Sequence, residues 1–298
     1  MIVAAFLAQT LRVVIPYLLA AAGGVLSERA GIVALTLEGF MLTGAFTAAL
    51  GSYYTGSPWV GVLTGMLGGV ALALLLALAT VRYKADQVVA GIALNLLAIG
   101  GTRFFLRYAF DSSSNSPRVP GFGGESGGAT GVLATLAASA ENPLVWIGLL
   151  VVPATAWLLY RTPFGLRIRA VGEKPEAARS LGVPVARVRV MGVACAGALA
   201  GLAGAYLALD QHQFTDGMTA GRGFIALAAV IFGRWDPKRV ALACVLFAAA
   251  ETFQIQLQGA QLVPSQFVEM IPYALTIVAL AGVVGRVRPP AALGRADG

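Results

Sequence analysis

The sequence predicts an all-α, polytopic membrane protein with about eight to ten transmembrane helices, and three features of its composition support this fold class. Hydrophobic residues make up 58% of the 298 residues, charged residues make up only 12%, and the mean hydropathy is +0.79. Soluble domains carry about 25% charged residues. The chain also holds 37 glycines, and small residues allow transmembrane helices to approach one another closely.

Apolar runs of roughly the length that crosses a bilayer, about 20 residues, mark the expected helices. These runs cover residues 2–26, 32–54, 58–81, 86–108, 142–160, 188–209, 221–233, 239–257 and 267–284. No basic region precedes the first run, so we expect a retained helix and not a signal peptide. The short run 221–233 predicts a half-helix or re-entrant piece, which is tolerated only where protein or a water-filled cavity covers its backbone.

The loops between these runs alternate in charge, and this alternation predicts the orientation. Most Lys and Arg residues lie on one side, which the positive-inside rule makes cytoplasmic. That side holds residues 27–31, 82–85, 161–187, 233–239 and the tail 286–298, and the other side holds 55–57, 109–141, 210–220 and 259–266. The N-terminus is therefore expected outside. The net charge of +7 follows from these loops and does not indicate nucleic-acid binding.

The domain organisation follows from the same pattern. Residues 1–285 are predicted to form a single transmembrane domain and residues 286–298 a cytoplasmic tail, of which PPAALGRADG, residues 289–298, is expected to be disordered. The Ser-, Gly- and Pro-rich stretch 109–141 reads as a long periplasmic loop. Two glycine series at four-residue spacing predict close-packing helix faces and not a binding site. They are Gly61, Gly65 and Gly69 in one run and Gly197 and Gly201 in another.

Polar side chains inside apolar runs are the candidates for a solute pathway, because they are costly in a bilayer. The four candidates are Glu38, Asn95, Glu251 and Gln254. Glu251, Gln254 and Gln258 share one helical face. Such a stripe suits a solute rich in hydroxyl or amide groups, but interhelical hydrogen bonds are an equally open explanation. Neither glutamate has an obvious charged partner at helical spacing.

Two other polar residues and several missing motifs limit the possible chemistry. Arg12, early in the first run, has an open role, and His212 is expected to be a surface residue. The sequence has no P-loop, no HExxH, no Gly-x-Ser-x-Gly and no metal-ligand spacing. Cys195 and Cys244 lie inside apolar runs and suggest neither a disulfide nor a metal site. We therefore expect no enzyme activity, cofactor or metal in this chain; any ATP and Mg²⁺ would be used by another subunit.

The stretch 161–187 is basic and carries its own helix signals. Pro175 suits the first position of a helix, Glu176 and Arg179 suit the two ends of its dipole, and Gly182 is placed to end it. A helix from Pro175 to Leu181 would be roughly 10 Å long, too short to span a bilayer. It predicts a small amphipathic helix at the membrane surface, and the alternative is an ordinary basic loop.

Four phrases in this order resemble a known family. They are GVLSERAGIVALTLEGFMLTGAF, DQVVAGIALNLLAIGGTRF, TPFGLRIRAVGEKPEAARSLGV and GRGFIALAAVIFGRWDP. Together they resemble permease subunits of bacterial ABC importers, in the superfamily of branched-chain amino acid, ribose and simple-sugar permeases. The LEG, ALNLL and GRGFIALAAVIFGRW phrases are most similar to the nucleoside and simple-sugar branch. The resemblance covers nearly the whole chain except residues 109–141 and the tail.

The resemblance implies a type II-importer-like permease in the bacterial cytoplasmic (inner) membrane. It makes the stretch 161–187 a coupling segment whose short helix docks on a cytoplasmic ABC ATPase. Seven residues match the family pattern there: Gly165, Arg167, Arg169, Gly172, Glu173, Pro175 and Ala177. It further implies a second permease subunit, usually in a heterodimer, and a periplasmic or lipid-anchored binding protein that delivers the solute.

Two other functions stay open from the sequence. Branched-chain amino acid uptake is the alternative within the superfamily. A stand-alone secondary transporter is the alternative from another class, in which Glu38 and Glu251 would act as proton carriers. Such a transporter would need an ion or proton site within the spans and would not need a docking helix.

Overall fold

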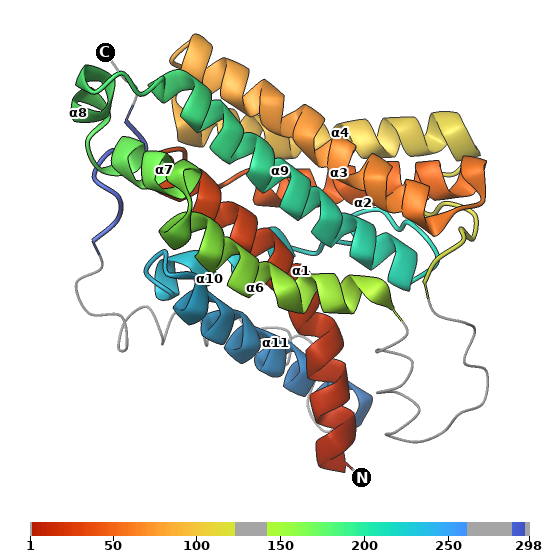
Figure 1. The fold of residues 1–298 in the computed structure, drawn as a ribbon. Coiled ribbons are helices and arrows are strands. Elements are labelled where there is room, and N and C mark those ends of the chain that lie inside the picture. The colour runs from red at the N-terminus through yellow and green to blue at the C-terminus, as the bar shows by residue number, and fades with distance from the viewer. Residues whose placement is uncertain (1, 123–141, 261–287, 296–298) are drawn as a thin grey trace.

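The computed structural model describes residues 2–122, 142–260 and 288–295, and this part of the chain is helical without a strand (Figure 1). Short connections join most neighbouring helices. The helices are α1 (Ile2–Arg29), α2 (Leu37–Thr55), α3 (Pro58–Ala77), the π-helix η1 (Leu78–Arg82), α4 (Gln87–Phe110), α6 (Pro143–Arg161), α7 (Pro163–Glu173), α8 (Pro175–Ser180), α9 (Val185–Asp210), α10 (Arg222–Phe232) and α11 (Pro237–Ala260).

Eight of the nine expected runs are helices in the structure, and the ninth, 267–284, lies outside the described residues. The short run is α10, which has 11 residues and is therefore a half-helix, as predicted. Six helices are long and apolar enough to cross a membrane: Phe6–Arg29, Pro58–Arg82, Gln87–Phe110, Pro143–Arg161, Val185–Asp210 and Pro237–Gln258. The described part of the chain is thus a multi-pass membrane protein.

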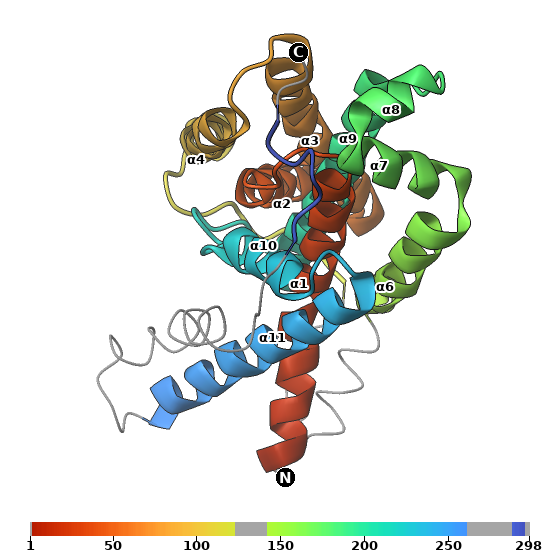
Figure 2. The ribbon, with the colours of Figure 1, turned by 90° about the vertical axis from the view of Figure 1, so that its left-hand side faces the viewer.

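Helix α2 is not among these six, yet it lies in the middle of the molecule. Glu38 and several glycines and hydroxyl residues dilute its hydropathy. Helices α3, α4, α9 and α10 pack around it. Figure 2 shows α2, α9 and α1 near the centre, with α4 on one side and α6, α7 and α8 on the other. Because other helices cover it, α2 tolerates polar groups that a lipid-facing helix would not.

The predicted glycine faces pack directly against each other. A Cβ atom added to Gly69 of α3 would lie 2.1 Å from the carbonyl oxygen of Gly197 in α9, and one on Gly201 would lie 2.4 Å from that of Gly65. Gly44 of α2 packs at the same place, because a Cβ atom added to it would lie 2.4 Å from the Cα atom of Gly201. These contacts let three helices approach at backbone distance, which confirms the expectation of close-packing faces.

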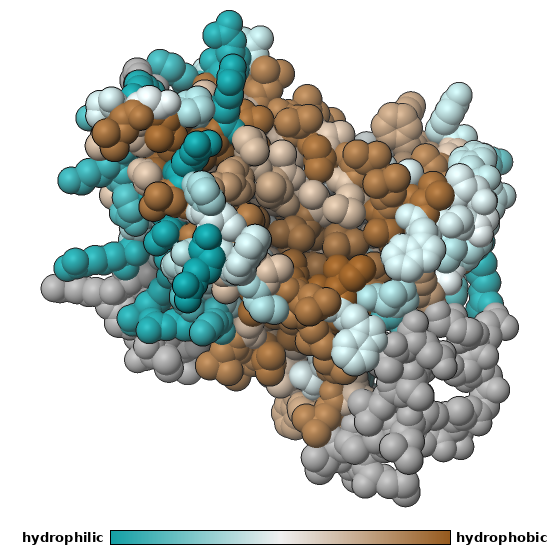
Figure 3. All heavy atoms as spheres, in the orientation of Figure 1, coloured by the Kyte–Doolittle hydropathy of each residue, from teal (hydrophilic) through white to brown (hydrophobic). Residues whose placement is uncertain are grey.

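Loops that were predicted to lie on the same side of the membrane contact each other at the same end of the structure. At one end, the backbone N–H of Ala292 donates to the carbonyl of Gly172 (2.9 Å). At the opposite end, Asn115 forms an isolated bridge with Thr215, and Arg103 pairs with Asp216 at 2.6 Å. Figure 3 shows an apolar band between two hydrophilic ends, as expected of a membrane-embedded chain.

Two local expectations were incomplete or wrong. The stretch 161–187 holds two helices and not one, because Thr162 caps a separate helix, α7, by accepting the N–H of Gly165 at 3.1 Å. The small helix α8 was correctly expected from Pro175. The expectation of a disordered end to the tail is wrong for residues 289–295, where the backbone is hydrogen-bonded and Ala292 is 2% exposed. The rest of the tail and residues 123–141 lie outside the described residues.

We expect Gly69→Ala to destabilise the protein by about 1–3 kcal/mol, because the new methyl group would overpack the contact with α9. Gly100→Ala is the matched control, since nothing lies within 4 Å of its added Cβ atom and alanine favours a helix. Thermal unfolding of the detergent-solubilised protein measures both changes. Equal melting temperatures for the two variants would contradict the close contact between α3 and α9.

Candidate functional site

The candidate site starts from a buried stretch of non-helical backbone between α1 and α2. Backbone polar groups inside a membrane protein must find partners within the protein. Side chains from α1 and α4 supply them here. Ser27 donates to the carbonyl of Ile32 (2.9 Å), Glu28 accepts from the N–H of Ala34 (3.2 Å), and Gln87 accepts from Val33 (2.8 Å) and donates to Gly31 (3.3 Å). This irregular connection is therefore held in one conformation.

Asn95 of α4 fixes the point where α2 begins. Its Oδ1 atom accepts the N–H of Gly39 at 2.9 Å, and its Nδ2 atom donates to the carbonyl of Leu35 at 3.0 Å. The first N–H groups of a helix lack partners within the helix, and Asn95 satisfies one of them from a neighbouring helix. Asn95 is 7% exposed. Its observed bonds are thus interhelical, the explanation that the sequence left open beside the solute pathway.

Glu38 binds the N-terminus of the half-helix α10. Its carboxylate accepts from the hydroxyl of Thr219 (2.6 Å) and from the backbone N–H groups of Gly221 (2.9 Å) and Gly223 (2.7 Å). A carboxylate is favourable at the positive end of a helix dipole. Gly223 allows this close approach, because a Cβ atom there would lie 2.4 Å from the backbone nitrogen of Glu38.

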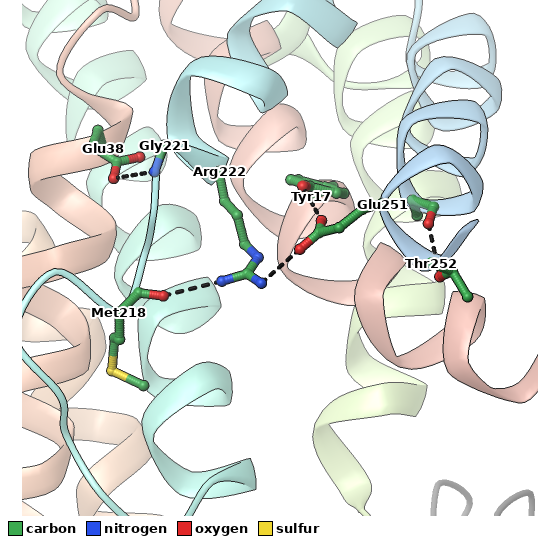
Figure 4. Close-up of polar contacts among 8 residues, drawn as sticks. Tyr17, Glu38, Met218, Gly221, Arg222, Glu251 and Thr252 are labelled. Carbon is green, nitrogen blue, oxygen red and sulfur yellow. Dashed lines mark hydrogen bonds and ion pairs between the residues drawn. The ribbon is translucent and has the colours of Figure 1, made fainter. Parts of the chain in front are cut away.

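Glu251 of α11 binds the other side of the same helix start. Its carboxylate pairs with Arg222, the first residue of α10, at 2.6 Å, and accepts a hydrogen bond from the hydroxyl of Tyr17 in α1. Arg222 also donates to the carbonyl of Met218 at 3.0 Å. Figure 4 shows Arg222 between the two carboxylates, with Glu38 and Gly221 on one side and Tyr17 and Glu251 on the other.

Glu251 thus has a charged partner, although none lies at helical spacing along its own helix. Arg222 lies 29 residues away in the sequence, so helical spacing could not reveal it. The available sequence signal was an arginine, Arg222, at the start of an apolar run. A carboxylate that holds a guanidinium and a phenol joins three helices, which does not suit a lone proton carrier.

The four pathway candidates do not meet in a single site. Asn95 lies on α4, which packs on α2 and α3, while Glu251 and Gln254 lie on α11, which packs on α1, α10 and α6. Gln254 is half-buried, one turn along from Glu251. The half-helix α10 connects the two groups, because Glu38 and Glu251 both bind its first turn.

The remaining polar residues take structural positions. Arg12 pairs with Asp210 at 3.3 Å, and Asn142 donates to the same carboxylate at 3.4 Å, so α1, α9 and the start of α6 are joined at the end opposite α7. Arg12, whose role the sequence left open, therefore forms an ion pair that joins α1 to α9. His212 is half-buried, and its backbone carbonyl accepts the N–H of Val119 at 2.9 Å. It is less exposed than the surface position that the sequence suggested.

The glycines expected in the coupling segment are packing positions. A Cβ atom on Gly165 would lie 2.1 Å from the carbonyl oxygen of Leu158, and one on Gly172 would lie 2.0 Å from that of Arg29. Gly165 therefore allows the sharp turn from α6 into α7, and Gly172 allows α7 to pack on the end of α1. Neither glycine is exposed to a partner protein.

The other residues of the coupling segment are exposed or contact neighbouring helices. Arg169 lies over the ring of Tyr160, 5.2 Å from its centroid, and Glu173 lies 4.0 Å from Arg29. Pro175 is the first residue of α8. The exposed positions that a partner could contact are Arg167, Glu173, Lys174, Glu176, Ala177, Arg179 and Leu181. Leu181 is 84% exposed, which is unusual for an apolar side chain outside the membrane spans.

Two cavities lie away from these residues. One, of about 400 Å³, is an apolar groove between α6 and α9, lined by Val151, Trp157, Leu158, Cys195 and Leu199, among others. The other, of about 550 Å³, lies between α2 and α4 and is lined by Phe46, Leu50, Tyr54, Phe105, Tyr108 and Ala109. Glu38, Asn95, Glu251 and Gln254 line neither cavity.

We expect Arg222→Gln or Glu251→Gln to destabilise the protein by about 1–3 kcal/mol, because each leaves a partly buried charge without its partner. The double variant should recover most of this loss, since no uncompensated charge remains. Thermal unfolding in detergent, arranged as a double-mutant cycle, measures the coupling between the two residues. Additive losses in the double variant would show that the ion pair does not hold α10 to α11.

Comparison with known proteins places this architecture in a family. The family model described as "Branched-chain amino acid transport system / permease component" matches residues 6–280. The chain is 35% identical to the guanosine ABC transporter permease protein NupQ of Bacillus subtilis, over 94% of this chain and 92% of that protein. It is 36% identical to the nucleoside ABC transporter permease protein NupC of Lactococcus lactis, over 95% and 92%.

The fold is also found in a solved structure. An ABC transporter in an inward-facing conformation aligns with a TM-score of 0.55 over 93% of this chain and 86% of that chain, at 15% identity. At that identity the match supports the fold alone, and it agrees with the expected type II-importer-like architecture. The family match and the two relatives cover the helices that hold Glu38, Glu251 and the α7–α8 segment. The chain therefore belongs to the branched-chain amino acid transport system permease family and is an ABC transporter permease.

Proposed function

We propose that this chain is the transmembrane subunit of an ATP-driven importer that carries nucleosides or simple sugars across the bacterial cytoplasmic membrane. The observation that carries the proposal is the α7–α8 segment. Its glycines pack it on the ends of α6 and α1, while its exposed residues form a basic surface at one end of the molecule. Such a surface suits docking of a cytoplasmic ATPase, which would use ATP and Mg²⁺.

The substrate class is taken from the relatives. NupQ and NupC are named for guanosine and nucleoside transport. A relative from Haloferax volcanii, TsgC13, is 37% identical over 87% of this chain and 79% of its own length. Its name describes it as a glucose ABC transporter permease. Branched-chain amino acids are the weaker alternative, supported by the name of the family model but by none of these three relatives.

A stand-alone proton-driven transporter fits the geometry less well. Glu38 accepts three hydrogen bonds at the start of α10, and Glu251 is paired with Arg222. Both carboxylates are thereby committed to holding helices together. In this proposal Glu38, Asn95 and Glu251 position α2 and α10 beside the solute pathway, and Gln254 faces the solute.

The proposed partners follow from the surfaces that the chain leaves open. Only 22% of an 18-residue apolar stretch of α4 is buried. Val89, Leu96 and Phe104 of this helix are 66%, 64% and 66% exposed. Such a face must meet membrane lipid or a second permease subunit, and we propose that the second subunit is a related but different chain. A periplasmic or lipid-anchored binding protein would deliver the solute at the end opposite α7.

The docking surface is tested by Ala177→Arg and Leu181→Asp. Each should lower the affinity for the ATPase about tenfold or more, which corresponds to about 1.4 kcal/mol, because bulk or charge is placed in the contact. Co-purification from detergent-solubilised membranes, followed by mass spectrometry, measures the bound ATPase. Ser113→Arg, exposed at the opposite end, is the control and should retain it. Recovery of wild-type amounts by all three variants would reject the docking role.

The solute pathway is tested by Gln254→Leu, with Gln256→Leu as the matched control on a different face of α11. We expect Gln254→Leu to lower uptake about fivefold with unchanged assembly, a loss of about 1 kcal/mol typical of one hydrogen bond. Asn95→Leu should lower uptake together with the melting temperature, because the cap of α2 is lost. Uptake of radiolabelled guanosine or glucose in proteoliposomes measures these effects. Equal uptake by the two glutamine variants would remove Gln254 from the pathway.

A further inference from the structure

The C-terminal segment 288–295 lies against the α7–α8 segment and has no role in the function proposed above. Figure 1 draws it in dark blue beside α7. It is folded into turns, in which the N–H of Leu293 donates to Pro290 at 3.0 Å and that of Arg295 to Ala292 at 3.2 Å. Ala292 is 2% exposed, and Leu293 packs on the core. Pro290 and Ala292 are thus buried while most of the segment is exposed, so the segment is anchored at these two residues.

Two backbone donors of this segment reach two different parts of the molecule. The N–H of Ala292 donates to the carbonyl of Gly172 in the last turn of α7 at 2.9 Å. The last carbonyls of a helix have no partner within it, so the segment caps α7. The N–H of Gly294 donates to the carbonyl of Gly31 at 3.3 Å. The segment thus joins the end of α7 to the connection between α1 and α2.

The α1–α2 connection is linked to α10 through Glu38, near the start of α2. The carbonyl of Gly31 also accepts a hydrogen bond from Gln87 at 3.3 Å. A few residues further on, Glu38 binds the first N–H groups of α10. A third contact, from Nη1 of Arg189 to the carbonyl of Arg295 at 3.4 Å, fixes the segment to α9. Continuous contacts therefore run from α7, through the C-terminal segment, to the start of α2 and to α10.

We propose that residues 290–295 are a positioning brace that transmits movement of the ATPase-docked α7 to the α1–α2 connection. The inference rests on the proposed function, since it assumes that an ATPase moves α7. The brace holds α7 from one side, and Arg29 of α1 holds it from the other, where Gly172 meets the Arg29 carbonyl. With the brace removed, α7 keeps its exposed docking face and its contact with Arg29, but loses the hydrogen-bonded link through Ala292 and Gly294 to Gly31.

The test compares two truncations in the complete transporter reconstituted in proteoliposomes. A stop after Pro289 removes the brace, and a stop after Arg295 keeps every contact described above. We expect the first to lower solute uptake per ATP hydrolysed at least fivefold, with the ATPase still bound in wild-type amounts. The second should behave as wild type. A wild-type ratio of uptake to hydrolysis after the first truncation would overturn the brace.

A pair of neighbouring alanines gives an independent test that leaves the chain length unchanged. Ala292→Asp places a charge at a buried position, whereas Ala291→Asp places it at an exposed one. We expect only Ala292→Asp to reproduce the loss of coupling. Equal behaviour of the two variants would overturn the proposal. So would loss of ATPase binding or of membrane assembly in both the shorter truncation and Ala292→Asp, because the segment would then build the fold or the docking surface. Failure of the wild-type chain to bind any ATPase would instead reject the proposed function.

Discussion

The structure depends on how a buried, non-helical backbone is satisfied inside a membrane protein. Between α1 and α2 the chain leaves the helix, and its N–H and carbonyl groups cannot turn to water. Ser27 and Glu28 at the end of α1, and Gln87 and Asn95 of α4, supply the missing partners. Because the bonds from Gln87 and Asn95 join segments that are 54 to 60 residues apart, satisfying the connection also sets where α4 lies and where α2 begins.

The same constraint explains the position of the half-helix α10. A helix of 11 residues does not cross a bilayer, so both of its ends must be held by protein. Glu38 binds its first N–H groups, Glu251 binds its first side chain, and Trp235, just beyond its other end, donates to Glu28. Polar residues that looked like isolated pathway groups are therefore connected through one short helix. In a transporter, an element held by a few polar contacts is well suited to change position.

The end of the molecule that carries α7 and α8 combines rigid packing with an exposed surface. Gly165 and Gly172 bring α7 within backbone distance of α6 and α1, and the C-terminal segment caps its last turn. Leu181, Ala177 and the nearby basic residues remain exposed. A segment that is attached to its own protein on one face and open on the other is what transmission between subunits requires, and the tight glycine contacts of α2, α3 and α9 would carry such a movement as a unit.

The sequence by itself determined what depends on neighbouring residues. The length of each apolar run predicted nine helices, eight of which fall in the described residues. The four-residue glycine spacing predicted the close-packing faces of α3 and α9, and Pro175 predicted the start of α8. Only the tertiary structure decided which polar groups meet. Glu38 and Thr219 are 181 residues apart, Glu251 and Arg222 belong to different helices, and Ala292 reaches Gly172 across the chain. Periodicity describes a single helix, whereas these bonds depend on how several helices pack together, so the partners of the candidate residues could not be read from the sequence.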